Sequence, residues 1–386
     1  MARISKFELF SLDLPFKQTI KHAAAERASS HSIVLKCVMD SGRSGFGECL
    51  PRKYVTAETR DHAYELLRSR ILPHLIGQDF SGIDELMSFL NRCNGKAPPE
   101  WVLPDTPQTA AWAAVDLALL DAFGHEFNKP VRLGNPGGSI PDFRYSIVFP
   151  SMEGFKAVKT LLKFRLYGFR QAKIKIDRNT AEDSVRLARR LLGRRCDIRV
   201  DANMTWDLPQ AREGMMKLAR YGISSFEQPL AVDDLHGLAA LVRETGLGVM
   251  VDESLNDSDS LETLIAERAC TAVNVRISKC GGLVASFNRC KRALEAGLSV
   301  QIGSQVGETS LLSAAQLILI QAVQPVSYTE GCFGLHVLQI DPVQPLLQFG
   351  YGGRPPELPS NPGIGVRINE DILKAWSHRI STIPST

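Results

Sequence analysis

Five ionisable residues recur at nearly constant intervals through the middle of the chain. They are Lys175, Asp201, Glu227, Asp252 and Lys279, and successive members lie 25 to 27 residues apart. Each one stands at or near the end of a short apolar segment of the kind that forms a buried strand. A strand, a helix and two short loops occupy about this length, so the interval indicates consecutive βα units.

The intervals predict an α/β fold in which eight parallel strands close into a (β/α)8-type TIM barrel. A helix-like stretch follows each of the five apolar segments, at 180–192, 209–221, 235–245, 258–268 and 284–296. Three further apolar segments supply the first, seventh and eighth strands, at 142–148, 298–303 and 326–330. Because functional side chains lie at the carboxyl ends of the strands in such a barrel, the five residues predict a single active site there.

Three of the five residues are carboxylates on neighbouring strands. Asp201, Glu227 and Asp252 would supply hard oxygen ligands, which suit Mg²⁺. Three carboxylates are more than the one or two that usually hold Mg²⁺, so Mn²⁺ is the alternative ion. A surface acid at a helix N-terminus would explain any one of them, but the equal spacing of all three favours a metal site.

The other two residues, together with a third lysine, are amines. Lys173 and Lys175 lie two apart in a strand, so their side chains project to the same face. Two ammonium groups that close disfavour each other's protonation, and one of them can then act as a base near pH 7. Lys279 would lie across the barrel from Lys175 if the second and sixth strands face each other. The competing explanation is that these lysines are ordinary surface residues. Exposed strand edges commonly carry alternating lysines, and Lys279 could face solvent just before a turn at Gly281-Gly282.

Amines on both sides of a metal-bound acid favour proton transfer at the carbon next to a carboxylate. Loss of that proton gathers charge on the carboxylate oxygens, and a divalent cation stabilises this enediolate as a Lewis acid. The expected substrate is therefore a small carboxylic acid. A catalytically silent binding barrel is the alternative from another class, and the complete set of acids and amines argues against it.

The chain is long enough for a second domain beside the barrel. A barrel takes about 250 residues, and the chain has 386. A hairpin and an alanine- and leucine-rich helix at 106–127 precede the first barrel strand. We therefore expect an α+β capping domain at 1–130, the barrel at 140–340, and a return of the chain to the capping domain at 341–386.

The composition fits a soluble globular protein. The formal charge of +3 gives no reason to expect nucleic acid or an anionic membrane as a partner. The eight cysteines are scattered without a Cys-x-x-Cys pair, which argues against a zinc site and fits a reducing cytoplasm. No apolar stretch reaches membrane-spanning length, and the N-terminus lacks the apolar core of a signal peptide. We expect a cytoplasmic enzyme that assembles as a homo-oligomer.

Five motifs in these segments resemble the enolase superfamily, and the resemblance covers nearly the whole chain. The motifs are Lys173-x-Lys175, Asp201-Ala202-Asn203, Glu227-Gln228-Pro229, Asp252-Glu253-Ser254 and Lys279-x-Gly281-Gly282. The resemblance implies a capped barrel that uses a lysine base together with Mg²⁺. It also implies a role for each residue: Asp201, Glu227 and Asp252 bind Mg²⁺, Lys175 and Lys279 are the acid/base pair, Lys173 binds the substrate carboxylate, and Asn203 and Glu253 support the metal ligands.

Within that superfamily the sequence resembles the muconate-lactonizing subgroup. No histidine lies between His236 and His336, whereas the mandelate-racemase type needs one at the seventh strand. Thr329-Glu330-Gly331 stands at the eighth strand, where dipeptide epimerases usually carry Asp-x-Asp. The resemblance implies a metal-dependent isomerase, with cycloisomerisation of a muconate-like diacid as the leading reaction. Racemisation or epimerisation of an N-acylated amino acid or dipeptide comes next, and dehydration, as in o-succinylbenzoate synthesis, would use the same enediolate.

The family places substrate specificity in two loops of the capping domain. Here those loops are expected at 16–30 and 51–55. Arg52, Lys53 and Tyr54 of the second loop could meet a distal polar or anionic group of the substrate. Glu330, at the eighth strand, is the further candidate for substrate binding. Ordinary surface charge is the competing explanation for the residues of the loop.

Overall fold

Eight parallel strands form a barrel whose strands follow one another in sequence order. The computed structural model describes residues 2–22, 25–134, 142–177 and 180–384. A parallel bridge between Tyr145 and Thr329 joins the first strand segment to the last, so the sheet closes on itself. The (β/α)8-type barrel with an N-terminal α+β capping domain is confirmed. The strands are β7 (Ile147–Phe149), β8 (Gln171–Lys175), β9 (Asp197–Asp201), β10 (Ile223–Glu227), β11 (Val249–Val251), β12 (Ala272–Val275), β13 (Ser299–Ile302) and β14 (Tyr328–Thr329).

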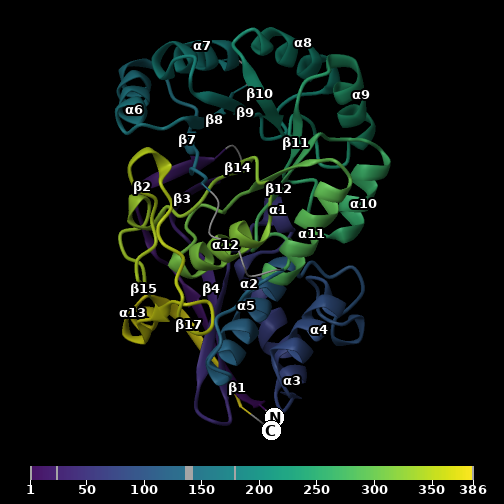
Figure 1. Cartoon of the computed structure of the whole chain (residues 1–386), viewed down its shortest axis with the longest axis vertical. Helices are drawn as coiled ribbons and strands as arrows, with labels where there is room; N and C mark the ends of the chain where they lie inside the picture. The colour runs from purple at the N-terminus through teal and green to yellow at the C-terminus, as the bar shows by residue number, and fades with distance from the viewer. Residues whose placement is uncertain (1, 23–24, 135–141, 178–179, 385–386) are drawn as a thin grey trace.

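Helices surround this barrel, and the ribbon shows α6 to α10 as an arc outside the strands (Figure 1). The five helices that the sequence predicts are confirmed to within two residues at each end. Three of them begin with side chains that accept backbone N–H groups: Asp207 at α8, Asp234 at α9 and Asp257 at α10. The helices are α6 (Gly154–Leu166), α7 (Ala181–Leu192), α8 (Leu208–Ala219), α9 (Leu235–Thr245), α10 (Ser258–Ala266), α11 (Leu283–Glu295) and α12 (Ser310–Ala322).

The capping domain pairs an antiparallel sheet with the buried helix α5. A Cβ atom at Gly47 would lie 2.0 Å from the carbonyl oxygen of Ala114, so only glycine lets the sheet approach α5 this closely. The sheet order is β17-β1-β4-β5, with β6 beside β1. These elements are β1 (Ala2–Leu12), β4 (Ser32–Met39), β5 (Ser44–Cys49), β6 (Asp79–Phe80), β17 (Ser377–Pro384), α2 (Arg60–Leu66), α3 (Leu72–Leu75), α4 (Ile83–Cys93) and α5 (Thr109–Glu126).

The last strand of the chain pairs with the first. β17 runs antiparallel to β1, and the two chain ends lie side by side in Figure 1. The segment before it forms β15 (Val343–Gln344), β16 (Arg367–Ile368) and α13 (Glu370–Ala375).

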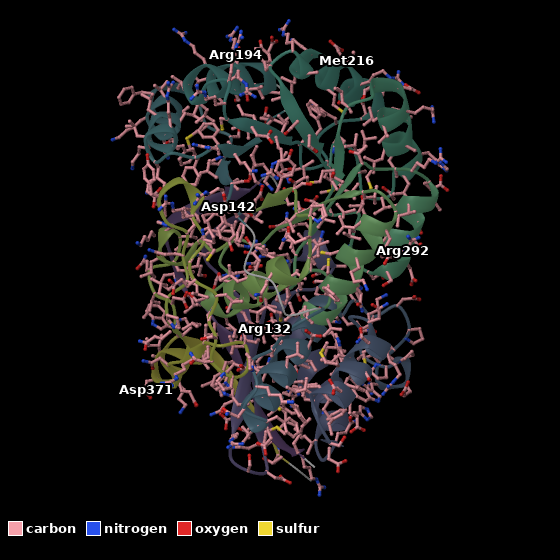
Figure 2. All side chains as sticks on the ribbon, viewed as in Figure 1. Arg132, Asp142, Arg194, Met216, Arg292 and Asp371 are labelled. Atoms are coloured by element: carbon pink, nitrogen blue, oxygen red, sulfur yellow. The ribbon has the colours of Figure 1, made fainter. Side chains whose placement is uncertain are left out.

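The boundary expected near residue 140 falls within 135–141, outside the described residues. Figure 2 shows the side chains of the described residues, and the exposed ones lie at the periphery of the molecule, among them Arg194, Met216 and Asp371. None of the described helices is long and apolar enough to cross a membrane.

Both segments expected to be loops contain regular structure. The first holds a hairpin of β2 (Pro15–His22) and β3 (Ala25–Ser29), and the second holds α1 (Lys53–Thr56). The hairpin is fixed by contacts that are distant in sequence. Lys17 donates its backbone N–H to Val337, and Gln339 donates to Pro15, both at 2.8 Å. A local sequence pattern could not reveal such partners.

The glycine pair after Lys279 joins the barrel to the capping domain. Gly281 and Gly282 have φ angles of +79° and +103°, which favour glycine. A Cβ atom at Gly281 would lie 2.2 Å from the carbonyl oxygen of Gly95, and one at Gly282 would lie 2.4 Å from the side chain of Asp116. Asp116 accepts the N–H of Leu283 at 2.6 Å and so caps α11. This part of the motif therefore has a structural role.

Replacement of Asp116 by Asn is expected to flatten the pH dependence of stability. Burial raises the pKa of Asp116 from 3.8 to about 7, so the folded state binds its proton more tightly than the unfolded state. The stabilisation is complete below pH 3.8 and is lost as the pH rises through 7, at up to about 1.4 kcal/mol per pH unit. Urea unfolding at pH 5, 6, 7 and 8 should show a shallower slope for Asp116→Asn. The exposed Asp105→Asn should keep the wild-type slope, and an unchanged slope in both variants would refute the assignment.

Candidate active site

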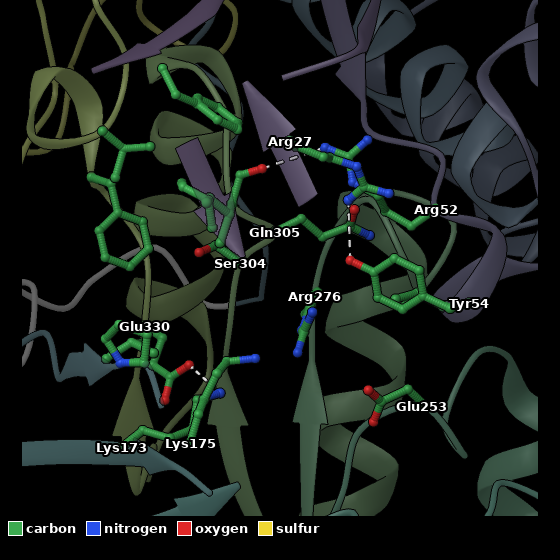
Figure 3. Close-up of a pocket in the computed structure, with 18 residues that line it drawn as sticks. Arg27, Arg52, Tyr54, Lys173, Lys175, Glu253, Arg276, Ser304, Gln305 and Glu330 are labelled. Atoms are coloured by element: carbon green, nitrogen blue, oxygen red, sulfur yellow. Dashed lines mark hydrogen bonds and ion pairs between the residues drawn. The ribbon is translucent and has the colours of Figure 1, made fainter. Parts of the chain in front are cut away.

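A cavity of about 270 Å³ lies at the carboxyl ends of the barrel strands, against the capping domain (Figure 3). Its size is close to the lower end of small-molecule sites, which span about 300–1,000 Å³. Barrel residues form one part of its polar lining: Lys173, Lys175, Glu253, Arg276, Ser304, Gln305 and Glu330. Arg27, Arg52 and Tyr54 of the capping domain form the other part, and the remaining lining is largely apolar.

The three carboxylates of the predicted metal site gather around two cations. Asp201 and Glu227 end β9 and β10, Asp252 follows β11, and all three are buried. The Nζ atom of Lys173 is 3.1 Å from Glu227 and 3.7 Å from Asp201. The guanidinium of Arg276 contacts Asp252 and is 3.8 Å from Glu227. Strand register therefore places these acids at one end of the barrel.

A ready-made metal cage, which the sequence led us to expect, is absent from the described residues. No three His, Cys, Asp or Glu side chains among them are arranged to hold an ion. Each carboxylate is neutralised by a lysine or arginine instead. The donor set still fits a hard divalent cation, because three buried carboxylates share a site that needs positive charge. Such an ion would take over charge compensation from Lys173 and Arg276.

The charges of this cluster shift the pKa values of its members in opposite directions. Burial would raise the pKa of Asp252, but Arg276 and Lys279 outweigh it and lower that pKa to about 2. Burial and the charge of Asp252 raise the pKa of Glu253 to about 8. For Lys173, burial opposes the charged form, yet Glu227 and Glu330 raise its pKa. Lys173 is thus held as a cation by its carboxylate neighbours.

Lys175 differs from Lys173 in its exposure and its partners. It lines the cavity with a side chain that is 22% exposed, against 3% for Lys173. Its Nζ atom donates to Asn203 Oδ1 at 3.1 Å and lies 3.5 Å from Asp201. The backbone N–H of Asn203 donates in turn to Asp201, at 3.1 Å. Asn203 therefore positions both an acid and an amine at this wall.

The prediction that Lys279 faces Lys175 across the cavity is wrong. Lys279 is fully buried, does not line the cavity, and donates to the Asp252 carboxylate at 2.9 Å and the Asn274 carbonyl oxygen at 2.9 Å. The chain turns sharply after β12, and the backbone N–H of Lys279 donates to the carbonyl oxygen of Arg276. This turn directs Lys279 behind Asp252.

Arg276 occupies the wall where Lys279 was expected. It directly follows β12, the sixth barrel strand, and lies across the cavity from the lysines of β8, the second strand (Figure 3). The sequence contained the signal, because Arg276 is the first residue after the apolar segment. Sequence reasoning chose the more distant Lys279 because an amine was expected on both walls.

Comparison with known proteins places the chain in a family. Residues 156–372 match the model described as "Enolase C-terminal domain-like". Residues 8–133 match the N-terminal domain of mandelate racemase and muconate lactonizing enzyme. The chain belongs to the enolase superfamily. The resemblance that its motifs indicated is therefore confirmed.

Relatives within the superfamily carry different activities in their names. The N-succinyl-L-Arg/Lys racemase of Bacillus cereus is 26% identical, over 96% of this chain and 97% of the relative. Its crystal structure aligns with a TM-score of 0.87 at 24% identity, covering 99% and 100% of the two chains. Muconate cycloisomerase 1 of Rhodococcus opacus is also 26% identical, over 97% and 98%. A dipeptide epimerase from Cytophaga hutchinsonii, solved with Mg and D-Ala-L-Val, has a TM-score of 0.85 at 21% identity, covering 99% and 100%.

The candidate substrate-binding residues of this enolase superfamily member divide into two groups. Glu330 lines the cavity, where it accepts from Arg199 at 2.9 Å and pairs with Lys173 at 2.7 Å. Arg52 and Tyr54 also line it, whereas Lys53 is exposed and does not. The prediction for Lys53 is therefore wrong, because α1 turns that side chain outward.

Besides Arg276, three polar residues of the cavity were missed by sequence reasoning. Arg27 lies on the hairpin strand β3, which was expected to be a loop. Ser304 and Gln305 follow β13, the seventh barrel strand. Their position after a strand end is the signal that could have found them, since the same rule identified the acids.

Proposed function

We propose that this member of the enolase superfamily is an isomerase that moves a proton at the carbon next to a substrate carboxylate. The observation that carries the proposal is the difference between the two cavity walls. Lys175, an amine, lies on one wall, and Arg276, a guanidinium, lies on the other. An arginine side chain does not lose its proton in proteins, so Lys175 is assigned the proton transfer.

Asp201, Glu227 and Asp252 would hold the metal ion, Mg²⁺ or Mn²⁺. When bound, this ion would stabilise the negative charge that collects on the substrate carboxylate during proton transfer. Lys173 would bind the same substrate carboxylate once its ion pair with Glu227 is broken. Asn203 orients Lys175, and Lys279 fixes Asp252 from behind. Glu253, the other residue expected to support the metal ligands, lines the cavity, and its Oε2 atom has no hydrogen-bond partner among the described residues.

A cavity in which only one wall carries a group that can exchange a proton favours a cycloisomerase of the muconate type. In that reaction a carboxylate oxygen bonds to one carbon of a C=C bond, and the electron pair of that bond moves toward the other carboxylate. The Lys175 ammonium then gives its proton to the α carbon. The product is a lactone with the same atoms as the dianion of the diacid plus that proton, which solvent returns to Lys175. Racemisation or epimerisation would instead need proton exchange on both faces, and Arg276 does not supply the second.

The proposal is tested by incubating the protein with Mg²⁺ in D₂O and a panel of acids. The panel holds muconate-like diacids, N-acylated amino acids, dipeptides and β-hydroxy acids, and products are followed by NMR. Lactone formation with deuterium at the α carbon is the expected result. Inverted configuration at an exchanged carbon would establish the epimerase alternative, loss of water the dehydratase alternative, and no reaction of any acid the silent barrel.

An Arg276→Lys variant should gain exchange on the second face. The α carbon of a lactone product carries two hydrogens, and the wild-type protein should exchange only the one that faces Lys175. A lysine at position 276 supplies a second amine, so prolonged incubation should place two deuterium atoms there. Mass spectrometry counts the label, and Arg276→Met serves as the matched control without an amine. Two deuterium atoms from the wild-type protein would contradict the one-wall assignment.

A further inference from the structure

Arg199 is a buried charged residue of the barrel that the proposed function does not use. It lies two residues before Asp201 on β9, so its side chain is on the same face of the strand as that acid. The strand register places it between Lys173 of β8 and Ser225 of β10. Only 1% of the residue is exposed, and it does not line the cavity. A molecule bound in the cavity would therefore not touch Arg199.

Three contacts fix the guanidinium of Arg199. Its Nη2 atom donates to Glu330 Oε1 at 2.9 Å and to Ser146 Oγ at 2.8 Å. The guanidinium carbon lies 4.2 Å from the centre of the Tyr328 ring, which is a cation–π contact. Ser146 directly precedes the first barrel strand and Tyr328 lies on the last, so Arg199 is held where the barrel closes. A planar group held in this way has little freedom to move.

Glu330 is shared between Arg199 and Lys173. One carboxylate oxygen, Oε1, accepts from Arg199, and the other, Oε2, lies 2.7 Å from the Nζ atom of Lys173 (Figure 3). Hydrogen bonds between charged groups are roughly twice as strong as those between neutral groups. The orientation of the Glu330 carboxylate therefore depends on Arg199, and the position of the Lys173 amine depends on Glu330.

The other carboxylate partners of Lys173 are two of the expected metal ligands. Its Nζ atom is 3.1 Å from Glu227 and 3.7 Å from Asp201. If both of these acids bind a metal ion, Glu330 is the one carboxylate of the described residues that stays within ion-pair distance of Lys173. Glu330 then has to hold the amine in place while Lys173 binds the substrate carboxylate.

We infer that Arg199 is a positioning residue for substrate binding. It fixes Glu330, and Glu330 holds the Lys173 amine at the cavity, so Arg199 strengthens binding of the substrate carboxylate without contacting it. The inference rests on the proposed function for the assignment of Lys173 to that carboxylate. Arg199 does not contact Lys175, so we expect its loss to change the affinity for the acid more than the exchange rate at saturation.

The affinity for adipate tests the inference, measured by titration calorimetry on the full chain with saturating Mg²⁺. Adipate is a diacid without the C=C bond that lactone formation needs, so binding is measured without turnover. Arg199→Met should weaken adipate binding by about 10- to 100-fold, the range expected for loss of one hydrogen bond between charged groups. Unchanged affinity in Arg199→Met, or absence of adipate binding by the wild-type protein, would overturn the inference.

A double-mutant cycle shows whether Arg199 acts through Glu330. Glu330→Gln keeps the shape of the side chain and removes its charge, and it should weaken adipate binding as well. Adding Arg199→Met to Glu330→Gln should then lower the affinity less than threefold further, because both changes break the same set of contacts. A general structural role would instead lower the affinity by the same factor in both backgrounds, and that result would overturn the inference.

A conservative variant keeps the test informative if Arg199→Met does not fold. Both hydrogen bonds of Arg199 come from Nη2, while Nε and Nη1 have no partner within the described ranges. A lysine amine can replace that one nitrogen, so Arg199→Lys should weaken adipate binding only about three- to tenfold. This smaller loss should also disappear in the Glu330→Gln background, and its persistence there would contradict the inference.

The matched control is an exposed arginine of the barrel. Arg186 of α7 pairs with Asp183 at the surface, and its side chain is 63% exposed. Arg186→Met should bind adipate as the wild-type protein does. A loss in Arg186→Met equal to that in Arg199→Met would show that the effect is not specific to the barrel interior, and would overturn the inference.

Failure of this inference differs from failure of the proposed function. Coupled losses of adipate affinity in a protein that exchanges no proton on any acid would overturn the function and leave the role of Arg199 in place. Proton exchange by the wild-type protein, with unchanged adipate affinity in Arg199→Met, would do the reverse.

Discussion

Replacement of Lys175 by Met is expected to slow α-proton exchange by about 10²- to 10⁴-fold, the usual contribution of a general acid–base group. The substitution removes the amine that faces the cavity beside Asn203 and leaves Lys173 with its carboxylate partners. The affinity for the acid should change little, because Lys173 is the residue assigned to the carboxylate. Deuterium uptake in D₂O measures the exchange, and calorimetry measures the binding.

Two comparisons separate this result from general damage. Lys156→Met, an exposed lysine of α6, should exchange at the wild-type rate. Lys173→Met should weaken binding of the carboxylate, because it removes the buried cation that would hold it. Exchange by Lys175→Met within threefold of the wild-type rate would refute the assignment of the proton transfer to Lys175.

Removal of the divalent ion is expected to lower activity by about 10³-fold or more. Stabilisation of carboxylate charge by a metal ion contributes several kcal/mol to the transition state, and each 1.36 kcal/mol is tenfold in rate. Dialysis against EDTA should abolish turnover, and Mg²⁺ or Mn²⁺ should restore it. Glu227→Gln should behave as the EDTA-treated protein does, because a neutral amide replaces one of the three carboxylates assigned to the ion. In the structure Lys173 and Asn274 donate to this carboxylate.

The control for the metal prediction is an acid of the surface. Glu262 pairs with Arg292 on the outside of the barrel, and Glu262→Gln should retain both activity and the response to Mg²⁺. Full activity after EDTA treatment, with residual metal excluded by elemental analysis, would contradict the role of the three carboxylates.

Sequence alone was sufficient for the barrel and for the position of its acids. The apolar segments are short, and the distance between them is fixed by the length of one βα unit. Asp201 and Glu227 are the last residues of their strands, so strand register decides where they lie. The same logic placed Lys173 and Lys175 on one face of β8, and both line the cavity.

Features that depend on turns and on distant contacts were not predictable in the same way. The turn after β12 buries Lys279 and leaves Arg276 at the cavity, although the two are only three residues apart. The hairpin that carries Arg27 is held by backbone partners more than 300 positions away in the chain, at 337–339. Lys53 points outward because α1 forms where a loop was expected.

Anomalous diffraction from a crystal soaked in Mn²⁺ tests the central claim most directly. The account predicts one strong peak in contact with carboxylate oxygens of Asp201, Glu227 and Asp252, with Lys173 and Arg276 displaced from these acids. The Lys175 amine should lie beside the ion, within reach of a bound acid. A crystal in which Mn²⁺ binds elsewhere, while Lys173 and Arg276 keep their carboxylate partners, would contradict it.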